Sequence, residues 1–172
     1  MKHNGFEYVD LGLPSGTRWA RCNVGANSET DYGLYFAFGE TNGYNRFTNG
    51  NRTFDRRNYK FSKKSFIYNF TKYNSTDGKK VLDVCDDAAY IHMGGKWHMP
   101  TDEQIRELIK NTENIWVTDY NNSGSFWSNS IDSYYSDCGK YLWFSPSGIW
   151  IGNGNRTLGL CVRGVFNTFW IK

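Results

Sequence analysis

The chain has 172 residues, enough for one domain with a single sizeable core, and a formal net charge of only +3. So small a charge does not by itself indicate a nucleic-acid partner. Aromatic residues make up 18% of the sequence, and no apolar run approaches the roughly 20 residues of a membrane span. The first residues also lack the apolar stretch of a signal peptide.

The N-terminal part predicts short strands. Residues 6–24 alternate around the turn Leu13-Pro14-Ser15-Gly16, which is typical of two strands joined by a tight turn. The second of these strands contains Trp19. A short aromatic segment at 33–39 follows, and then a polar, basic segment at about 41–80.

The middle of the chain predicts two short helices. The first, near 86–92, begins with acidic residues and ends before a glycine pair. The second, near 101–110, begins with a capping box made by Thr101 and Gln104. Short strands are expected from there to the C terminus. This order indicates an α+β domain over residues 1–172, with a twisted, mostly antiparallel sheet formed largely by the C-terminal third.

The C-terminal third combines an apolar frame with polar and aromatic residues. The predicted core residues are Trp19, Phe36, Trp97, Trp127, Leu142, Phe144 and Val162. Between the apolar positions of 126–165 lie Tyr, Trp, Ser, Gly and Asn, a mixture typical of binding surfaces. Since side chains alternate along a strand, the residues between Leu142 and Phe144 should face away from the core. The predicted ligand-binding residues are Asp132, Tyr134, Tyr135, Tyr141, Trp143, Trp150, Asn153, Asn155, Thr157 and Leu158.

The basic segment at 41–80 has two interpretations. Basic residues interleaved with Phe and Tyr can form a stacking groove for single-stranded nucleic acid. Alternatively, the segment is a solvated insertion whose aromatic side chains fold back onto the core. No nucleic-acid motif accompanies the charge, which favours the second interpretation.

Other side-chain patterns indicate structural roles, and we predict no catalytic residue, cofactor or metal site. The four cysteines have no metal-ligand spacing and are expected to be free, buried thiols. The acidic cluster of Asp83, Asp86 and Asp87 lacks a calcium-loop pattern and is expected to cap a helix. Arg163 follows an apolar strand and is expected to have a structural partner.

Five segments resemble, in this order, the Fibrobacter succinogenes major paralogous domain family of Bacteroidetes surface proteins. They are VDLGLPSGTRWARCNVGA (9–26), YGLYFAFGE (32–40), KKVLDVCDDAAYIHMGGKWHMPT (79–101), FWSNS (126–130) and LGLCVRGV (158–165). The resemblance implies a C-type-lectin-like fold of the formylglycine-generating-enzyme type from about Tyr8 to Val165. The chain departs from the family by a short segment between Trp116 and Phe126 and by an apolar tail at 166–172.

Within this fold, the variable proteins of diversity-generating retroelements place their mutable residues in a C-terminal segment of this kind. The resemblance therefore implies a non-catalytic protein that binds a protein or glycan ligand on a cell surface. It also implies display on a virion or a bacterial surface, as part of a larger phage or surface assembly. One alternative is a Bacteroidetes surface or adhesin domain without diversification. A more remote one is an oxidase like the formylglycine-generating enzymes, whose closely spaced reactive cysteine pair is not found in this sequence.

Retroelement diversification changes template adenines, so the codon AAC can give most of the predicted ligand-binding residues. It can give Asp, Tyr, Asn, Thr and Leu but not Trp, so Trp143 and Trp150 do not fit this origin. An ordinary family domain with strand and turn aromatics remains an alternative at this stage.

Overall fold

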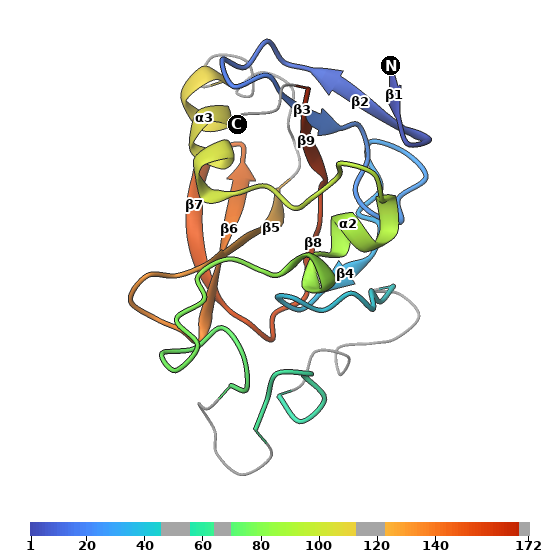
Figure 1. Ribbon diagram of the computed structural model, residues 1–172. Coiled ribbons are helices and arrows are strands. Elements are labelled where there is room, and N and C mark those ends of the chain that lie inside the picture. The colour runs from blue at the N-terminus through green and yellow to red at the C-terminus, as the bar shows by residue number, and fades with distance from the viewer. Residues whose placement is uncertain (46–55, 64–69, 113–122, 169–172) are drawn as a thin grey trace.

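The computed structural model describes residues 1–45, 56–63, 70–112 and 123–168, and within these ranges the chain has an α+β fold with two sheets (Figure 1). Most of the segment between Trp116 and Phe126, residues 169–172 of the tail and parts of the basic insertion lie outside the described residues. The predicted fold class is confirmed at this level, with mostly antiparallel sheets and two α-helices among the described residues.

The smaller sheet joins the two ends of the chain. Its order is β1-β2-β3-β9, all antiparallel. The predicted turn connects β2 to β3, where the Gly16 N–H donates to the Leu13 carbonyl at 2.8 Å. Gly16 has a φ of 72°, which a glycine adopts without strain. The strands are β1 (Lys2–His3), β2 (Phe6–Asp10), β3 (Thr17–Ala20) and β9 (Val165–Asn167).

The larger sheet comes mainly from the C-terminal third, as predicted. Its order is β4-β8-β5-β6-β7, and only the β5–β8 pair is parallel. The long strands β5, β6 and β7 form a meander whose last strand lies at the edge of the sheet (Figure 1). The strands are β4 (Tyr35–Phe36), β5 (Gly124–Ile131), β6 (Cys138–Ser145), β7 (Gly148–Asn155) and β8 (Leu160–Cys161).

The helical segments are the short η2 (Val84–Asp86), α2 (Ala88–Met93) and α3 (Asp102–Thr112), close to the predicted ranges. Asp87 caps α2 by accepting from the Tyr90 N–H at 2.9 Å. The predicted capping box of α3 is present, since Thr101 and Gln104 bond reciprocally at 2.9 and 3.2 Å. Among the described residues, no helix has the length and apolar character needed to cross a membrane.

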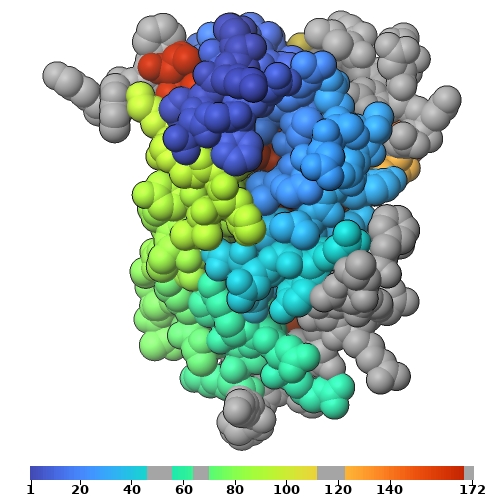
Figure 2. Space-filling model, turned by 90° about the vertical axis from the view of Figure 1, so that its right-hand side faces the viewer, coloured from blue at the N-terminus to red at the C-terminus, as the bar shows by residue number. Residues whose placement is uncertain are grey.

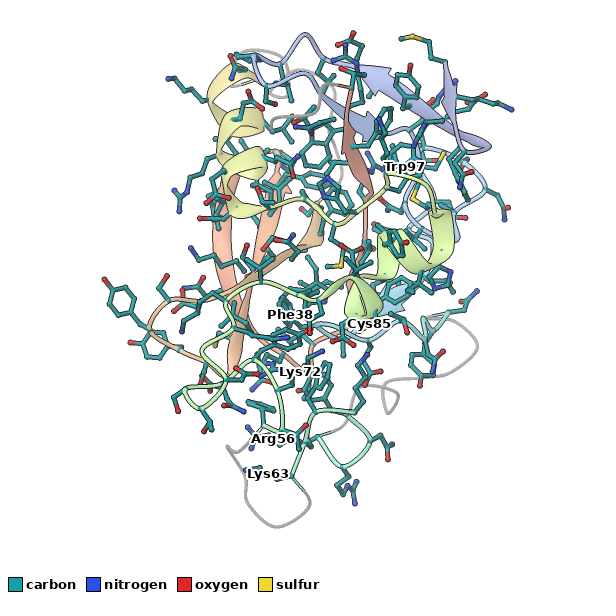
Figure 3. The ribbon with its side chains drawn as sticks, in the orientation of Figure 1. Phe38, Arg56, Lys63, Lys72, Cys85 and Trp97 are labelled. Atoms are coloured by element: carbon teal, nitrogen blue, oxygen red, sulfur yellow. The ribbon has the colours of Figure 1, made fainter. Side chains whose placement is uncertain are left out.

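The core has two clusters. The larger lies between η2, α2 and one face of the C-terminal sheet and includes Phe38 and Trp97, which Figure 3 labels. The smaller lies under α3 on the opposite face and includes Trp19, Ile105 and Leu142. Of the predicted core residues, only Phe144 is half-buried, and it packs against the smaller cluster. The predicted core is therefore confirmed.

Arg156 is completely buried and holds the basic insertion against the turn after β7. Its guanidinium donates to the Tyr59 hydroxyl at 3.0 Å and to the backbone carbonyls of Lys72, Tyr73 and Ser136 at 3.1–3.3 Å. Five aromatic rings surround it, with centroids 4.2–5.9 Å from Cζ. These rings belong to Phe38, Tyr59, Phe61, Phe70 and Tyr73.

The described part of the insertion thus folds back onto the core, as the second interpretation of this segment expected. Tyr59, Phe61, Phe70 and Tyr73 are all buried. Burial raises the pKa of Tyr59, although the Arg156 guanidinium opposes the shift. The hydroxyl is therefore neutral at pH 7, and it donates in turn to the Phe38 carbonyl at 2.6 Å.

We predict that Arg156→Lys lowers the free energy of unfolding by about 2–4 kcal/mol, because an ammonium cannot reproduce the planar set of donors and leaves buried carbonyls unpaired. Urea denaturation followed by tryptophan fluorescence measures this loss. Arg106→Lys on the exposed face of α3 is the control and should cost less than about 0.5 kcal/mol. Equal losses in the two variants would contradict a central role for Arg156.

Candidate binding surface

The hairpin of β6 and β7 has two chemically different faces. The register pairs Leu142 with Ile151 and Trp143 with Trp150, so neighbouring pairs point to opposite sides. The side of Leu142 is covered by α3 and the smaller core cluster. On the opposite side, Tyr141, Trp143, Trp150 and Leu158 form what we call the aromatic face.

The centre of the aromatic face is a pair of stacked indoles. The ring centroids of Trp143 and Trp150 are 3.9 Å apart, with 34° between the ring planes. Trp150 is 47% exposed and Leu158 46% exposed, while Trp143 is half-buried. Large apolar side chains left at the surface together are typical of an interaction site.

Tyr141 connects this face to the core. Its ring lies against the backbone of two β7 glycines, and a Cβ added at Gly152 would come within 2.7 Å of the ring. Its other contact is with buried Trp127, edge to face at 5.9 Å. Leu158 lies over one of these glycines, Gly154, beside Tyr141. Tyr141 is half-buried, so its replacement by Ala would also disturb packing, which the sequence did not indicate.

The loop 132–137 presents two tyrosines. Tyr134 is 91% exposed and Tyr135 63% exposed. Asp132 was predicted to bind ligand on an exposed surface, but it is 5% exposed and shapes the loop instead. Its Oδ1 accepts from the backbone N–H groups of both tyrosines at 2.9 Å. The predicted contact role of Asp132 is therefore corrected to a positioning role.

The remaining predicted residues lie near the end of β7. Asn155 accepts from the Thr157 N–H and hydroxyl at 3.0 and 2.8 Å, which fixes the turn into β8. Asn153 is exposed and pairs with Lys140, on the α3 side of the sheet. The alternation places Asn153 and Trp150 on opposite sides of the sheet, so the predicted residues do not all share one face. Four of them, Asp132, Tyr134, Trp150 and Asn153, nevertheless line one groove along the edge of β7.

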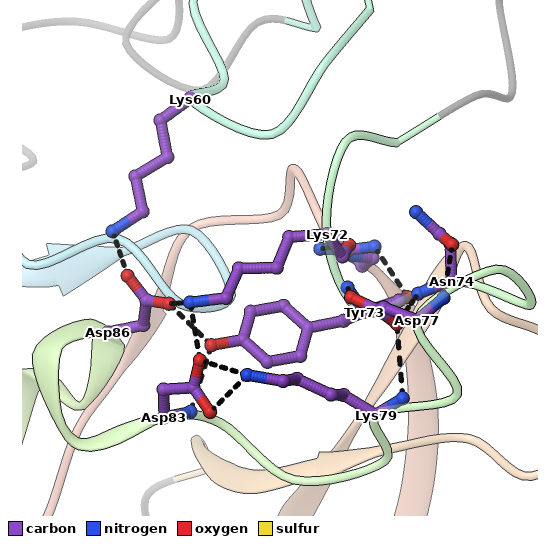
Figure 4. Close-up of polar contacts among 9 residues, drawn as sticks. Lys60, Lys72, Tyr73, Asn74, Asp77, Lys79, Asp83 and Asp86 are labelled. Atoms are coloured by element: carbon purple, nitrogen blue, oxygen red, sulfur yellow. Dashed lines mark hydrogen bonds and ion pairs between the residues drawn. The ribbon is translucent and has the colours of Figure 1, made fainter.

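The described lysines of the basic insertion are largely engaged in an ionic cluster around Asp86 (Figure 4). Lys60 and Lys72 place their Nζ atoms 2.8 and 2.5 Å from the two Asp86 oxygens, and the Tyr73 hydroxyl also donates to this carboxylate. Lys79 pairs with Asp83 at 2.6 Å. Lysines held in this way are poorly placed to track a nucleic-acid backbone.

This environment shifts the pKa of Asp86. Burial favours a higher pKa, but the hydrogen bonds from Lys60, Lys72 and Tyr73 hold the pKa of Asp86 below its usual range. For Asp83, hydrogen bonds from Lys72 and Lys79 also lower the pKa. Both groups are thus carboxylates at neutral pH, paired with lysines rather than with a metal. Within the described ranges, no group of three or more acidic, His or Cys side chains could hold a metal ion.

The cysteines are free thiols, as predicted, but only Cys161 is buried, and Cys85 is exposed. A hollow of about 470 Å³ lies where the N-terminal strands meet α2, on the face that Figure 2 shows, and is lined in part by Cys22 and His92. The Nε2–H of His92 donates to the Thr41 carbonyl at 2.8 Å.

Arg163 has its expected structural partner, the Asn23 side-chain oxygen at 2.8 Å.

Sequence patterns could have indicated part of what was missed. Glycines at alternate positions of β7 suggest that a large side chain on the neighbouring strand lies over them, as Tyr141 does. A buried role for Asp132 could have been inferred from the turn that follows it, because Asp readily bonds the next backbone N–H groups.

Searches of protein-family models, curated proteins and solved structures find no match to this chain.

We predict that Asp86→Asn destabilises the fold at pH 7 by about 2–3 kcal/mol, because Lys60 loses its carboxylate and Lys72 keeps only Asp83, 2.7 Å away. A carboxylate whose pKa is lowered by folding stabilises the protein above its unfolded pKa, whose ordinary value is 3.8. That contribution is lost as the pH falls through the lower folded pKa.

The difference between wild type and Asp86→Asn should therefore shrink between pH 4 and the acid limit of folding. Urea unfolding at a series of pH values measures it. Glu103→Gln, at an exposed position of α3, is the control and should stay within about 0.5 kcal/mol of wild type throughout. A deficit of Asp86→Asn that does not change with pH would contradict the assignment.

Proposed function

We propose that the protein is a non-catalytic ligand- or receptor-binding protein, which presents a variable surface on a C-type-lectin-like scaffold. The observation that carries this proposal is the exposed aromatic face beside the tyrosine-bearing loop, on a sheet that packs against a core cluster on each side. Trp and Tyr are the residues that most often dominate binding energy. The ligand class is a protein or glycan on a cell surface.

The cysteines favour binding over catalysis. A reactive thiol requires a lowered pKa and an electropositive setting. Burial raises the pKa of Cys138, and the neighbouring Asp137 carboxylate raises it further. Cys161 is buried in β8. Neither environment favours the thiolate that an oxidase of the formylglycine-generating type would need.

The backbone of the tyrosine-bearing loop is held by contacts that do not involve its exposed side chains, which supports diversification. The loop 132–137 is fixed by backbone bonds, by buried Asp132 and by Arg156, whose N–H also donates to the Asp137 carbonyl at 3.0 Å. Tyr134 and Tyr135 can therefore be exchanged without loss of packing. Asp132, which also fits the codon pattern, is buried, so variation there would disturb the scaffold. The exposed positions are the better candidates for variation.

The gene neighbourhood distinguishes this proposal from a surface or adhesin domain without diversification. Under the proposal, a reverse-transcriptase gene lies nearby, with a near-copy of the 3′ end of this gene that differs at adenines. Differences that fall on the codons of Tyr134, Tyr135 and Leu158 would support the assignment. An adhesin would lack both elements and would still use the aromatic face.

We predict that Trp143→Ala and Leu158→Ala each weaken ligand binding at least about ten-fold. Both side chains lie on the aromatic face outside the deepest core, so the thermal unfolding temperature should change little. The measurement uses wild type and variants on arrays of glycans and of purified bacterial surface proteins. The control is Tyr90→Ala, an aromatic residue 40% exposed on α2. Ligands that bind Trp143→Ala and wild type equally would refute a role for this face.

A further inference from the structure

An open groove of about 600 Å³ runs between α3 and the last strand of the C-terminal sheet. From α3 it is lined by Arg106 and Lys110, and from β6 by Lys140. From β7 it is lined by Ile149, Trp150 and Ile151. Ile149 and Ile151 point to one side of the sheet and Trp150 to the other, so a groove lined by all three follows the edge of the strand.

The outer side of β7 offers backbone groups to which a further strand could hydrogen-bond. β7 is eight residues long and is the last strand of its sheet. In the part of the chain that the structure describes, no strand pairs with its outer side. In an antiparallel pair, alternate residues direct their N–H and C=O groups away from the partner strand. β7 can therefore hydrogen-bond another extended chain along the groove.

The groove carries an excess of positive charge. Arg106 and Lys140 both bond the same carboxylate oxygen of Asp102, at 3.1 Å each, so one acid is shared by two cations. Lys110 adds a third cation from the next turn of α3. Asp132 lines the groove itself, and its Oδ1 accepts from backbone N–H groups. The cationic side chains thus outnumber the carboxylates at this edge.

We propose that the groove binds an extended, acidic polypeptide segment, which adds to the sheet as a strand beside β7. Backbone bonds to the strand edge would supply affinity. Carboxylates on one side of the segment would meet Arg106, Lys110 and Lys140 on the α3 side, and apolar side chains on its other side would contact Trp150. The inference rests on the proposed binding function and names the chemistry of the partner on the α3 side. The groove shares Trp150 with the aromatic face, whose other residues lie outside the groove.

The edge of β7 favours a polypeptide over an acidic polysaccharide. A polysaccharide could use the cations, but it offers no regular series of amide groups to match the strand. The cations on the α3 side of β7 and the indole of Trp150 on the other side also suit alternating acidic and apolar residues, whose side chains point to opposite sides of a strand. The segment is thus expected to alternate between the two residue classes.

The test uses a fluorescein-labelled peptide of alternating Glu and Val, as long as β7, with fluorescence anisotropy at low and high salt. Three comparison probes are the Lys-Val peptide, the Glu-Val peptide N-methylated at alternate residues, and an oligogalacturonate. We expect the Glu-Val peptide to bind, its affinity to fall with salt, and the Lys-Val and N-methylated peptides to bind at least about ten-fold more weakly. Oligogalacturonate should bind more weakly than the Glu-Val peptide.

Lys110→Glu should weaken binding of the Glu-Val peptide at least about ten-fold, because it reverses an exposed charge in the groove. Lys2→Glu, in the other sheet, is the matched control and should bind as wild type does. Leu158→Ala, on the aromatic face, should also keep peptide binding. Circular dichroism confirms that each variant is folded.

Failure of the Glu-Val peptide to bind, equal binding of its N-methylated form, or stronger binding of oligogalacturonate would each overturn the strand inference. None of these outcomes touches the proposed function, which stands or falls with the effects of Trp143→Ala and Leu158→Ala on array ligands. Peptide binding that survives Lys110→Glu unchanged would place the peptide elsewhere and would also overturn the inference.

Discussion

The buried guanidinium of Arg156 is the interaction on which the rest of the structure depends. Removal of a charge from water is costly unless polar groups replace the water. Here the replacements come from segments far apart in the sequence, namely Tyr59, the 72–73 backbone and Ser136. The aromatic rings around Arg156 add favourable cation–π contacts and exclude water. The turn after β7, the insertion and the tyrosine-bearing loop are therefore fixed by one side chain.

This arrangement explains how a surface rich in exposed aromatics can coexist with a stable fold. The loop 132–137 is positioned by its backbone, through Asp132 and Arg156, and not by its exposed side chains. Tyr134 and Tyr135 contribute little to packing, so changes there leave the loop in place. A binding surface built in this way can vary in chemistry without variation in shape. That property is what the proposed diversified role requires.

The sequence predicted elements better than it predicted which side chains share a surface. The helix near 101–110 followed from the capping box at Thr101, because capping is a local interaction. The role of Arg156 depends on segments about 20 to 97 residues away in the chain, and no local pattern shows such contacts. Asn153 was grouped with Trp150 because both lie in a polar, aromatic stretch. Strict alternation along β7 separates them, but the sequence did not show that one continuous strand runs through both positions.

The two sides of the β6–β7 hairpin have different physical requirements. On the aromatic face, the stacked indoles at 3.9 Å leave apolar area in contact with water, which is unfavourable unless a partner covers it. Along the outer edge of β7, backbone N–H and C=O groups point away from the sheet, and water can hydrogen-bond to them in the free protein. A partner on the aromatic face thus gains affinity from area, whereas one at the edge gains direction and register from hydrogen bonds. β7 contributes to both the aromatic face and the outer edge. A ligand that contacts both surfaces would therefore combine affinity from the aromatic face with specificity from the edge.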